Sequence, residues 1–175
     1  QINDLTPVAS LTNLVHLISN ENQISDLTPV AGLTKLAHLI SDDNRISDLT
    51  PLAKLTNLEH LALGYNKITD VTPLKGLINL TELSLPGNEI ADLTQLAGLA
   101  KLTKLHLYDN SITDLRPLAR LSNLETLDLP YNAITDIRPL TGMTKLKVLR
   151  LRNNPITSDQ KKMLRKALPH TDIDF

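Results

Sequence analysis

Apolar residues recur along this chain with a period of 22 residues, and each period repeats the same order of apolar and variable positions. In the phrase that runs from Leu58 to Asn66, leucine occupies the first, fourth and sixth positions, and asparagine the ninth. The alternation around Leu61 and Leu63 predicts a short strand whose apolar row points inward. One coil cannot bury that row alone, but stacked coils can. The pattern therefore predicts a solenoid.

A polar residue ends the phrase in every repeat. An asparagine amide offers two donors and an acceptor, so it can bind backbone groups that remain unpaired where the chain leaves the strand. We therefore expect this residue to stabilise the turn inside the stack. The series is Asn22, Asn44, Asn66, Asn88, Asn110, Asn132 and Asn154.

An aspartate and a proline follow most of these asparagines. In the middle repeat they are Asp70 and Pro73, an order that predicts a capped helical turn, because aspartate accepts early N–H groups and proline suits a first turn. Gln95 replaces the proline once. We expect short 3₁₀ or single-turn α segments on the convex side of the solenoid. The aspartate recurs as Asp26, Asp48, Asp92, Asp114 and Asp136.

The two ends depart from the repeat. The chain opens within the second half of a repeat, so we expect a fragment with a truncated first repeat. Near the other end, Thr157 and Gln160 have the spacing of a capping box, apolar residues follow at helical spacing, and Pro169 ends the helix. The predicted organisation is seven 22-residue repeats over 1–157 and a C-terminal cap over 158–175, with a helix and then a closing strand.

The repeated phrase L-x-x-L-x-L-x-x-N is typical of leucine-rich repeats. Its continuation, Ile68-Thr69-Asp70-Val71-Thr72-Pro73-Leu74, resembles the repeat of the bacterial internalins, and the resemblance extends over residues 1–157. It implies an α/β solenoid with a curved parallel β-sheet on the concave face and short 3₁₀ turns on the convex face. Internalins are cell-surface or secreted proteins whose concave face binds a host receptor. The resemblance therefore implies protein binding and that location, and we expect no signal peptide within this fragment.

Composition changes this picture little. The chain has no cysteine and no apolar run long enough to span a membrane. Its net charge of −1 hides an asymmetry: residues 1–87 carry 9 acidic and 5 basic residues, whereas residues 88–175 carry 10 acidic and 13 basic ones. Basic residues of the predicted C-terminal helix account for part of this excess, as a solvated face does. We expect neither a nucleic-acid partner nor a membrane span.

Motifs for catalysis are missing from the sequence. The glycines form no phosphate-binding loop, and there is no H-E-x-x-H or G-x-S-x-G motif. The abundant aspartates already have a structural explanation in the helical turns. We predict a non-enzymatic protein that requires no cofactor.

Three histidines invite a sharper hypothesis. His16, His38 and His60 share the third position of the phrase, and Glu82 follows in the same column. Parallel strands lie about 4.8 Å apart, so the outer histidines are too far apart to converge easily on one zinc ion. We favour an exposed polar ladder that contacts a partner. A metal-binding or pH-responsive role remains the alternative.

The remaining positions on the concave face vary from repeat to repeat, as a recognition surface requires. Repeats one and two place serine at the inward sixth position and isoleucine before it; a local bulge would reverse these directions. Without a bulge, the isoleucines lie on the concave face. The candidate partner-binding residues among these columns are Ile18, Ile40, Lys104, His106, Asp128, Arg150 and Arg152.

The tyrosines are the strongest candidates for partner contact. All three in the chain, Tyr65, Tyr108 and Tyr131, fall in the seventh and eighth positions of the phrase. Tyrosine is enriched at binding hot spots, because it buries much area and keeps a polar tip. The alternative is that these rings only cover neighbouring strands. We predict a monomeric protein-interaction module that binds a protein ligand on its concave face. The alternative is an assembly domain that self-associates through its uncapped N-terminal edge.

Overall fold

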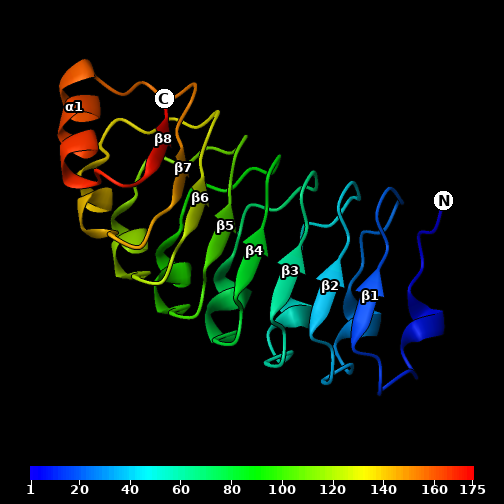
Figure 1. Cartoon of the computed structure of the whole chain (residues 1–175). Coiled ribbons are helices and arrows are strands. Elements are labelled where there is room, and N and C mark those ends of the chain that lie inside the picture. Colours follow the sequence, from blue (N-terminus) through cyan, green and yellow to red (C-terminus); the bar gives the residue numbers. More distant parts are fainter.

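The computed structural model describes residues 1–175, and it contains one open sheet of eight parallel strands in the order of the sequence. Figure 1 shows the strands side by side along the axis of the solenoid. Each repeat strand spans the third to fifth positions of its phrase, with the central leucine directed inward. The strands are β1 His16–Ile18, β2 His38–Ile40, β3 His60–Ala62, β4 Glu82–Ser84, β5 Lys104–His106, β6 Thr126–Asp128, β7 Val148–Arg150 and β8 Asp172–Asp174.

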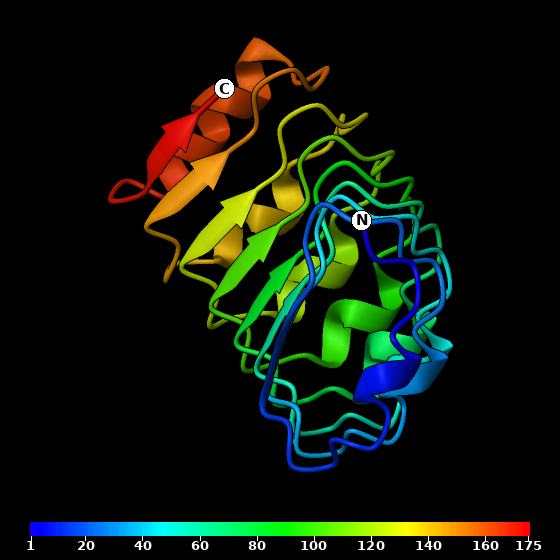
Figure 2. The same cartoon turned by 90° about the vertical axis from the view of Figure 1, so that its right-hand side faces the viewer.

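Short 3₁₀ turns form the opposite side of the solenoid, as the sequence predicts. Figure 2 looks along the stack and shows the sheet and these turns on opposite sides of the coils. The fold class is therefore confirmed as a leucine-rich-repeat solenoid with a concave strand side. The turns are η1 Thr6–Val8, η2 Thr28–Val30, η3 Thr50–Leu52, η4 Thr72–Gly76, η5 Thr94–Gly98, η6 Arg116–Arg120 and η7 Arg138–Gly142.

The core is one continuous apolar column between the sheet and the turns. It contains 44 buried residues, and the leucines of the repeat phrase, such as Leu58, Leu61 and Leu63, are completely shielded from solvent. Each coil contributes residues from the same positions of the phrase, so burial depends on the neighbouring coils rather than on any coil alone.

The asparagines connect consecutive coils through their amides. The Nδ2 of Asn88 donates to the carbonyls of Leu85 and Pro86 in its own repeat, at 3.2 and 3.1 Å, and to Leu63 of the preceding repeat at 3.0 Å. Its Oδ1 accepts the N–H of Ile68 at 2.9 Å. The same set recurs at the other interior asparagines, including Asn110. The predicted satisfaction of turn backbone groups is confirmed.

The aspartates accept an early N–H group of each turn, as predicted, but from one residue before the N-cap position. The residue before each 3₁₀ turn is apolar, as at Leu49, and no side chain caps these turns. Asp48 lies one residue earlier, and its Oδ1 accepts the N–H of Thr50 at 2.8 Å. This is an Asx turn, in which a carboxylate binds the backbone two residues on. The aspartate therefore shapes the entry to the turn.

Repeats one and two keep the register of the others. Ser19 and Ser41 are buried, and their hydroxyls lie 3.0 Å apart. The Nδ2 of Asn44 also reaches the Ser41 hydroxyl, at 3.1 Å. The serines thus form a polar contact inside the stack, where leucines stand in later repeats. The bulge considered above is absent, and the isoleucine side chains at 18 and 40 lie on the strand face.

Helix α1, Ser158–Ala167, covers the end of the stack next to β7 and β8 (Figure 1). Thr157 is its N-cap and accepts the N–H of Gln160. The predicted capping box is only half formed, because the Gln160 side chain binds the preceding repeat instead. It accepts the N–H of Ile137 at 2.9 Å and donates to the carbonyl of Thr135 at 2.7 Å. Gln160 therefore fastens the helix to the last repeat.

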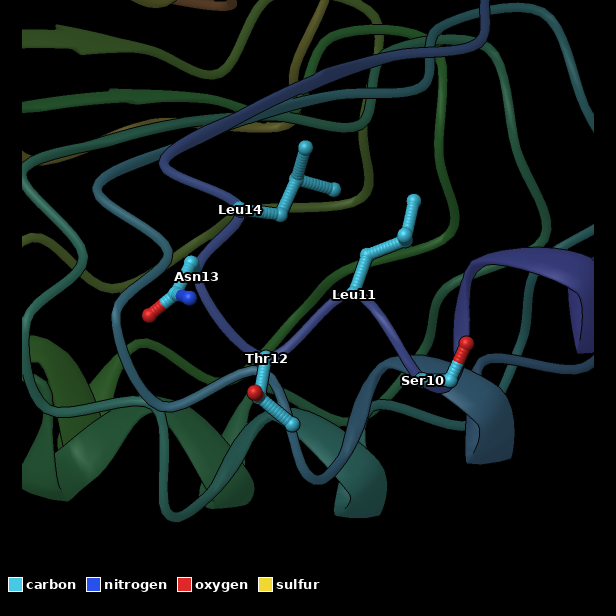
Figure 3. Close-up of a pocket in the computed structure, with 5 residues that line it drawn as sticks. All are labelled: Ser10, Leu11, Thr12, Asn13 and Leu14. Carbon is cyan, nitrogen blue, oxygen red and sulfur yellow. The ribbon is translucent and has the colours of Figure 1, made fainter.

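At the other end, the first coil exposes apolar side chains. A hollow of about 370 Å³ is lined by the consecutive residues 10–14. Figure 3 shows the Leu11 and Leu14 side chains pointing to the same side of the coil. The hollow contains no ionisable group, so we assign it no chemistry. None of the helices combines the length and apolar character that crossing a bilayer requires.

We predict that Asn88→Ala lowers the free energy of unfolding by roughly 2–4 kcal/mol, because each buried backbone group left without a partner costs about 1–3 kcal/mol. Asn88 is 8 % exposed and binds groups in two coils, so water cannot replace the amide easily. Urea unfolding of the wild type and the variant measures the difference.

Asn57→Ala is the matched control. Asn57 is exposed and donates one inter-coil hydrogen bond, to the carbonyl of Thr34 at 2.7 Å. Its removal should cost less than about 1 kcal/mol, as for an ordinary exposed hydrogen bond. Equal urea midpoints for the two variants would contradict the structural role assigned to the repeating asparagine.

A second prediction concerns acid stability. A hydrogen bond from the Arg138 side chain lowers the pKa of Asp136 from 3.8 to about 2. A lowered folded-state pKa stabilises the protein above the unfolded pKa, and this contribution disappears as the pH falls through the folded pKa. We expect the melting temperatures of wild type and Asp136→Asn to differ at pH 5 and to converge between about pH 4 and 2. A difference that does not change with pH would refute this assignment.

Candidate functional site

The concave face is formed by the side chains at the third and fifth positions of each phrase, with the seventh and eighth positions along its rim. Parallel pairing in register aligns each position into a column across the sheet. Ile18 is 67 % exposed at the N-terminal end of this face, and Ile40 beside it is half-buried. An apolar patch thus marks the start of the face.

The three column histidines lie next to one another, as predicted. The rings of His16 and His38 are stacked with centroids 4.4 Å apart, whereas those of His38 and His60 are tilted and 5.8 Å apart. His60 Nε2 lies 3.8 Å from a carboxylate oxygen of Glu82. No group of three or more histidine, aspartate or glutamate side chains has a geometry that could hold a metal ion.

The charged columns in the second half of the face pair across strands. Lys104 Nζ lies 3.1 Å from a Glu82 carboxylate oxygen, and Arg152 Nε donates to Asp174 at 2.6 Å. Opposite charges on adjacent strands attract weakly where they are exposed. The predicted contact residues Lys104 and Arg152 therefore enter any interface with carboxylate partners already in place.

A tighter ionic row joins β5, β6 and β7. His106 Nδ1 lies 2.6 Å from Asp128 Oδ2, and Arg150 donates to Asp128 Oδ1 at 3.0 Å. Burial alone would raise the pKa of Asp128, which is 8 % exposed, but the hydrogen bonds from His106 and Arg150 outweigh it and lower that pKa. The sequence places these residues in one column, and only the structure shows that Asp128 binds both neighbours.

Ser84 precedes His106 and Asp128 in the same column, which gives the order of a serine-hydrolase triad. The Ser84 hydroxyl makes no hydrogen bond with the His106 ring, although His106 binds Asp128. The contact between nucleophile and base that characterises such a triad is therefore not formed. We interpret the row as an electrostatic part of the surface.

The three tyrosines meet on the rim. Together with Asp109 they line a hollow of about 340 Å³. The hydroxyls of Tyr65 and Tyr108 lie 3.3 Å apart, and their rings meet edge to face at a centroid distance of 6.3 Å. This hydrogen bond, with partial burial, raises the pKa of Tyr108 to about 12. The Tyr108 phenol is thus neutral at physiological pH. The side chains of Tyr65 and Tyr131 are 46 % and 61 % exposed.

The eighth position has a backbone constraint that the sequence analysis missed. It adopts the left-handed conformation in every phrase, with φ of 52° at Tyr65 and 55° at Tyr131. Glycine, asparagine and aspartate tolerate this conformation, whereas bulky side chains rarely adopt it. The signal in the sequence was the set of small or Asx residues that shares the column: Asp43, Gly87, Asp109 and Asn153.

Gly87 makes room for the Tyr65 ring. A Cβ atom at Gly87 would lie 2.4 Å from Tyr65 Cδ1, closer than any real contact allows. The backbone at Gly87, with φ of 60°, also favours glycine. Tyr65 therefore lies over the next coil and points toward Tyr108, two repeats along from it.

Comparison with known proteins agrees with this architecture. The sequence matches the family described as leucine rich repeats (2 copies) over residues 34–76, 78–120 and 122–161. No curated protein matches the chain in sequence.

Solved structures resemble the whole chain closely. An internalin (inlF) from Listeria monocytogenes superposes on 100 % of the chain with a TM-score of 0.94 and 33 % identity. An internalin C2 from the same species covers 98 % with a TM-score of 0.86 and 35 % identity. A leucine-rich-repeat protein from Leptospira interrogans covers 97 % with a TM-score of 0.91 and 30 % identity.

The chain corresponds to 51 % of the length of the first of these proteins, 76 % of the second and 45 % of the third. The similarity thus extends over the whole of this chain and over the repeat phrase, the parallel sheet and the 3₁₀ turns described above. The chain belongs to the leucine-rich-repeat family and, within it, to the internalin-like proteins of bacteria.

Proposed function

We propose that this protein is a non-enzymatic interaction module whose concave face binds a protein partner. Leucine-rich-repeat proteins are in general protein-interaction modules, and solenoids of this kind offer extended concave surfaces to their partners. The framework residues repeat, while the residues on the concave face change from coil to coil. Such variation suits the recognition of a specific, irregular surface.

The observation that carries the proposal is the tyrosine hollow on the rim. Tyr131 holds a left-handed backbone conformation that disfavours large side chains by about 1–2 kcal/mol, and its exposed ring gives little burial in return. Tyr131 thus lowers the stability of the fold and faces solvent. Both properties suggest that the residue was selected for contact with a binding partner. The ring would gain its burial in the complex.

The paired charges have a different part in the proposal. Asp128 is bound by His106 and Arg150, so this row would present a fixed pattern of polar atoms. Polar groups held in place give orientation and specificity more than affinity. We assign most of the binding energy to the tyrosines. The stacked histidines and the isoleucines at 18 and 40 would extend the contact toward the N-terminal end of the face.

We predict that Tyr131→Asn preserves or slightly raises stability and weakens partner binding at least tenfold. Asparagine occupies the equivalent left-handed position at Asn153, so the variant fits the backbone while it removes the ring. Hot-spot tyrosines contribute about 2 kcal/mol or more to binding. Urea unfolding gives the stability, and pull-down of the partner followed by affinity measurement gives the binding.

The control is a pair of substitutions on the convex side, Lys75→Ala and Arg120→Ala, which remove two exposed charges far from the strands. These variants should retain the partner at wild-type affinity. A partner that is lost with the convex variants and retained by Tyr131→Asn would place the interface on the other side of the solenoid. Destabilisation of Tyr131→Asn by more than about 2 kcal/mol would show that the ring supports the fold instead.

A further inference from the structure

We infer that the tyrosine hollow is a binding pocket for a guanidinium group, and that the partner inserts an arginine side chain into it. This inference rests on the proposed function and specifies the chemistry of the partner at one site. The pocket is lined by the rings of Tyr65, Tyr108 and Tyr131 and by Asp109, with no cationic residue among them.

The first argument is electrostatic. The face of an aromatic ring carries partial negative charge, so it attracts a cation placed over it. The phenols add no positive charge, and Asp109 adds a full negative one at the edge of the hollow. The pocket therefore favours a positively charged occupant over an anionic or purely apolar one.

The second argument concerns Asp109 itself. Its carboxylate takes part in none of the eight ion pairs of the molecule, and no side chain donates a hydrogen bond to it. In the next repeat, by contrast, the Glu125 carboxylate is paired with Lys147 and the Asp128 carboxylate with Arg150. Asp109 is thus left with free acceptor oxygens, and it lines the same hollow as the three tyrosines.

The third argument excludes an occupant from the chain itself. Arg152 has electrostatic contact with Tyr131, but its guanidinium is bound to Asp174 at 2.6 Å. The ionic row of His106, Asp128 and Arg150 is likewise complete. No cationic side chain of this molecule lines the hollow, so a cation that occupied it would come from outside.

Arginine fits these features better than lysine. Guanidinium is planar and weakly hydrated, stacks on aromatic faces, and can bind a carboxylate through two parallel hydrogen bonds. A lysine ammonium is strongly hydrated and cannot stack. An occupant that covers a tyrosine ring and reaches Asp109 at the same time needs both properties of the guanidinium group.

The composition of the protein supplies a selective probe. The chain has no tryptophan, and its three tyrosines all line this hollow, so the intrinsic fluorescence of the intact protein reports on this site alone. We propose titrations with Nα-acetyl-arginine amide, Nα-acetyl-lysine amide and Nα-acetyl-citrulline amide at constant ionic strength. Citrulline is the matched control, because it keeps the shape of arginine and lacks its charge.

We expect a saturable fluorescence change with the arginine compound, with half-saturation in the millimolar range, and binding at least fivefold weaker for the lysine and citrulline compounds. Asp109→Asn should weaken arginine binding by a similar factor while it preserves the fold, because asparagine tolerates the φ of 57° at this position. Circular dichroism checks the fold of the variant.

Three results would overturn the inference: no saturable response to arginine, equal responses to arginine and citrulline, or equal affinity for arginine and lysine. The pull-down described above separates these failures from failure of the proposed function. A partner whose capture needs Tyr131 and ignores Asp109→Asn would leave concave-face binding intact and refute only the guanidinium pocket.

Discussion

The structure depends above all on the hydrogen bonds of the repeating asparagine. A solenoid must turn the chain out of the sheet once in every coil, and each turn leaves backbone groups unpaired in the interior. Asn88 binds three carbonyls and one N–H group across two coils. It therefore joins the coils while it completes the turn. A leucine column without this ladder would bury unpaired polar backbone groups, each at a cost of about 1–3 kcal/mol.

The same turn shapes the rim of the concave face. To bring the asparagine amide inward, the preceding residue adopts a left-handed conformation in every phrase. Most coils meet this constraint with glycine, asparagine or an acidic residue, whereas two coils hold Tyr65 and Tyr131 there. The backbone geometry that stabilises the stack also directs these rings along the rim. The glycine at position 87 allows the first ring to lie over the next coil.

Charge is distributed on this face in two ways. In the second half of the sheet, most acidic side chains meet a basic one on an adjacent strand, as Asp128 meets Arg150. Such pairs fix the direction of side chains, and their exposed members contribute little stability. Asp109 differs, because it lies on the rim at the edge of the tyrosine hollow and has no ionic partner. The contrast indicates that local pairing, rather than net charge, decides which group is available to a partner.

The sequence determined the elements that repeat. A fixed period places leucine, asparagine and aspartate at equivalent positions in each coil. The same period therefore predicts both the local structure of a coil and its packing against the next one. The register of Ser19 and Ser41, the inward asparagine and the 3₁₀ turns could all be predicted on that basis. The predicted capping box was wrong in one respect, because the Gln160 side chain makes its hydrogen bonds with another repeat. It binds the backbone of Ile137 instead of completing the box.

Only the tertiary structure decided how the irregular residues combine. The sequence placed the three tyrosines in two columns, but it did not show that Tyr65 and Tyr108, two coils apart, share a hydrogen bond. Nor did it show the binding of Asp128 by both His106 and Arg150. The repeat period determines which residues lie next to one another on adjacent strands, because the strands pair in register. The rotamers that bring those side chains together depend on contacts between coils, and no single phrase of the sequence contains them.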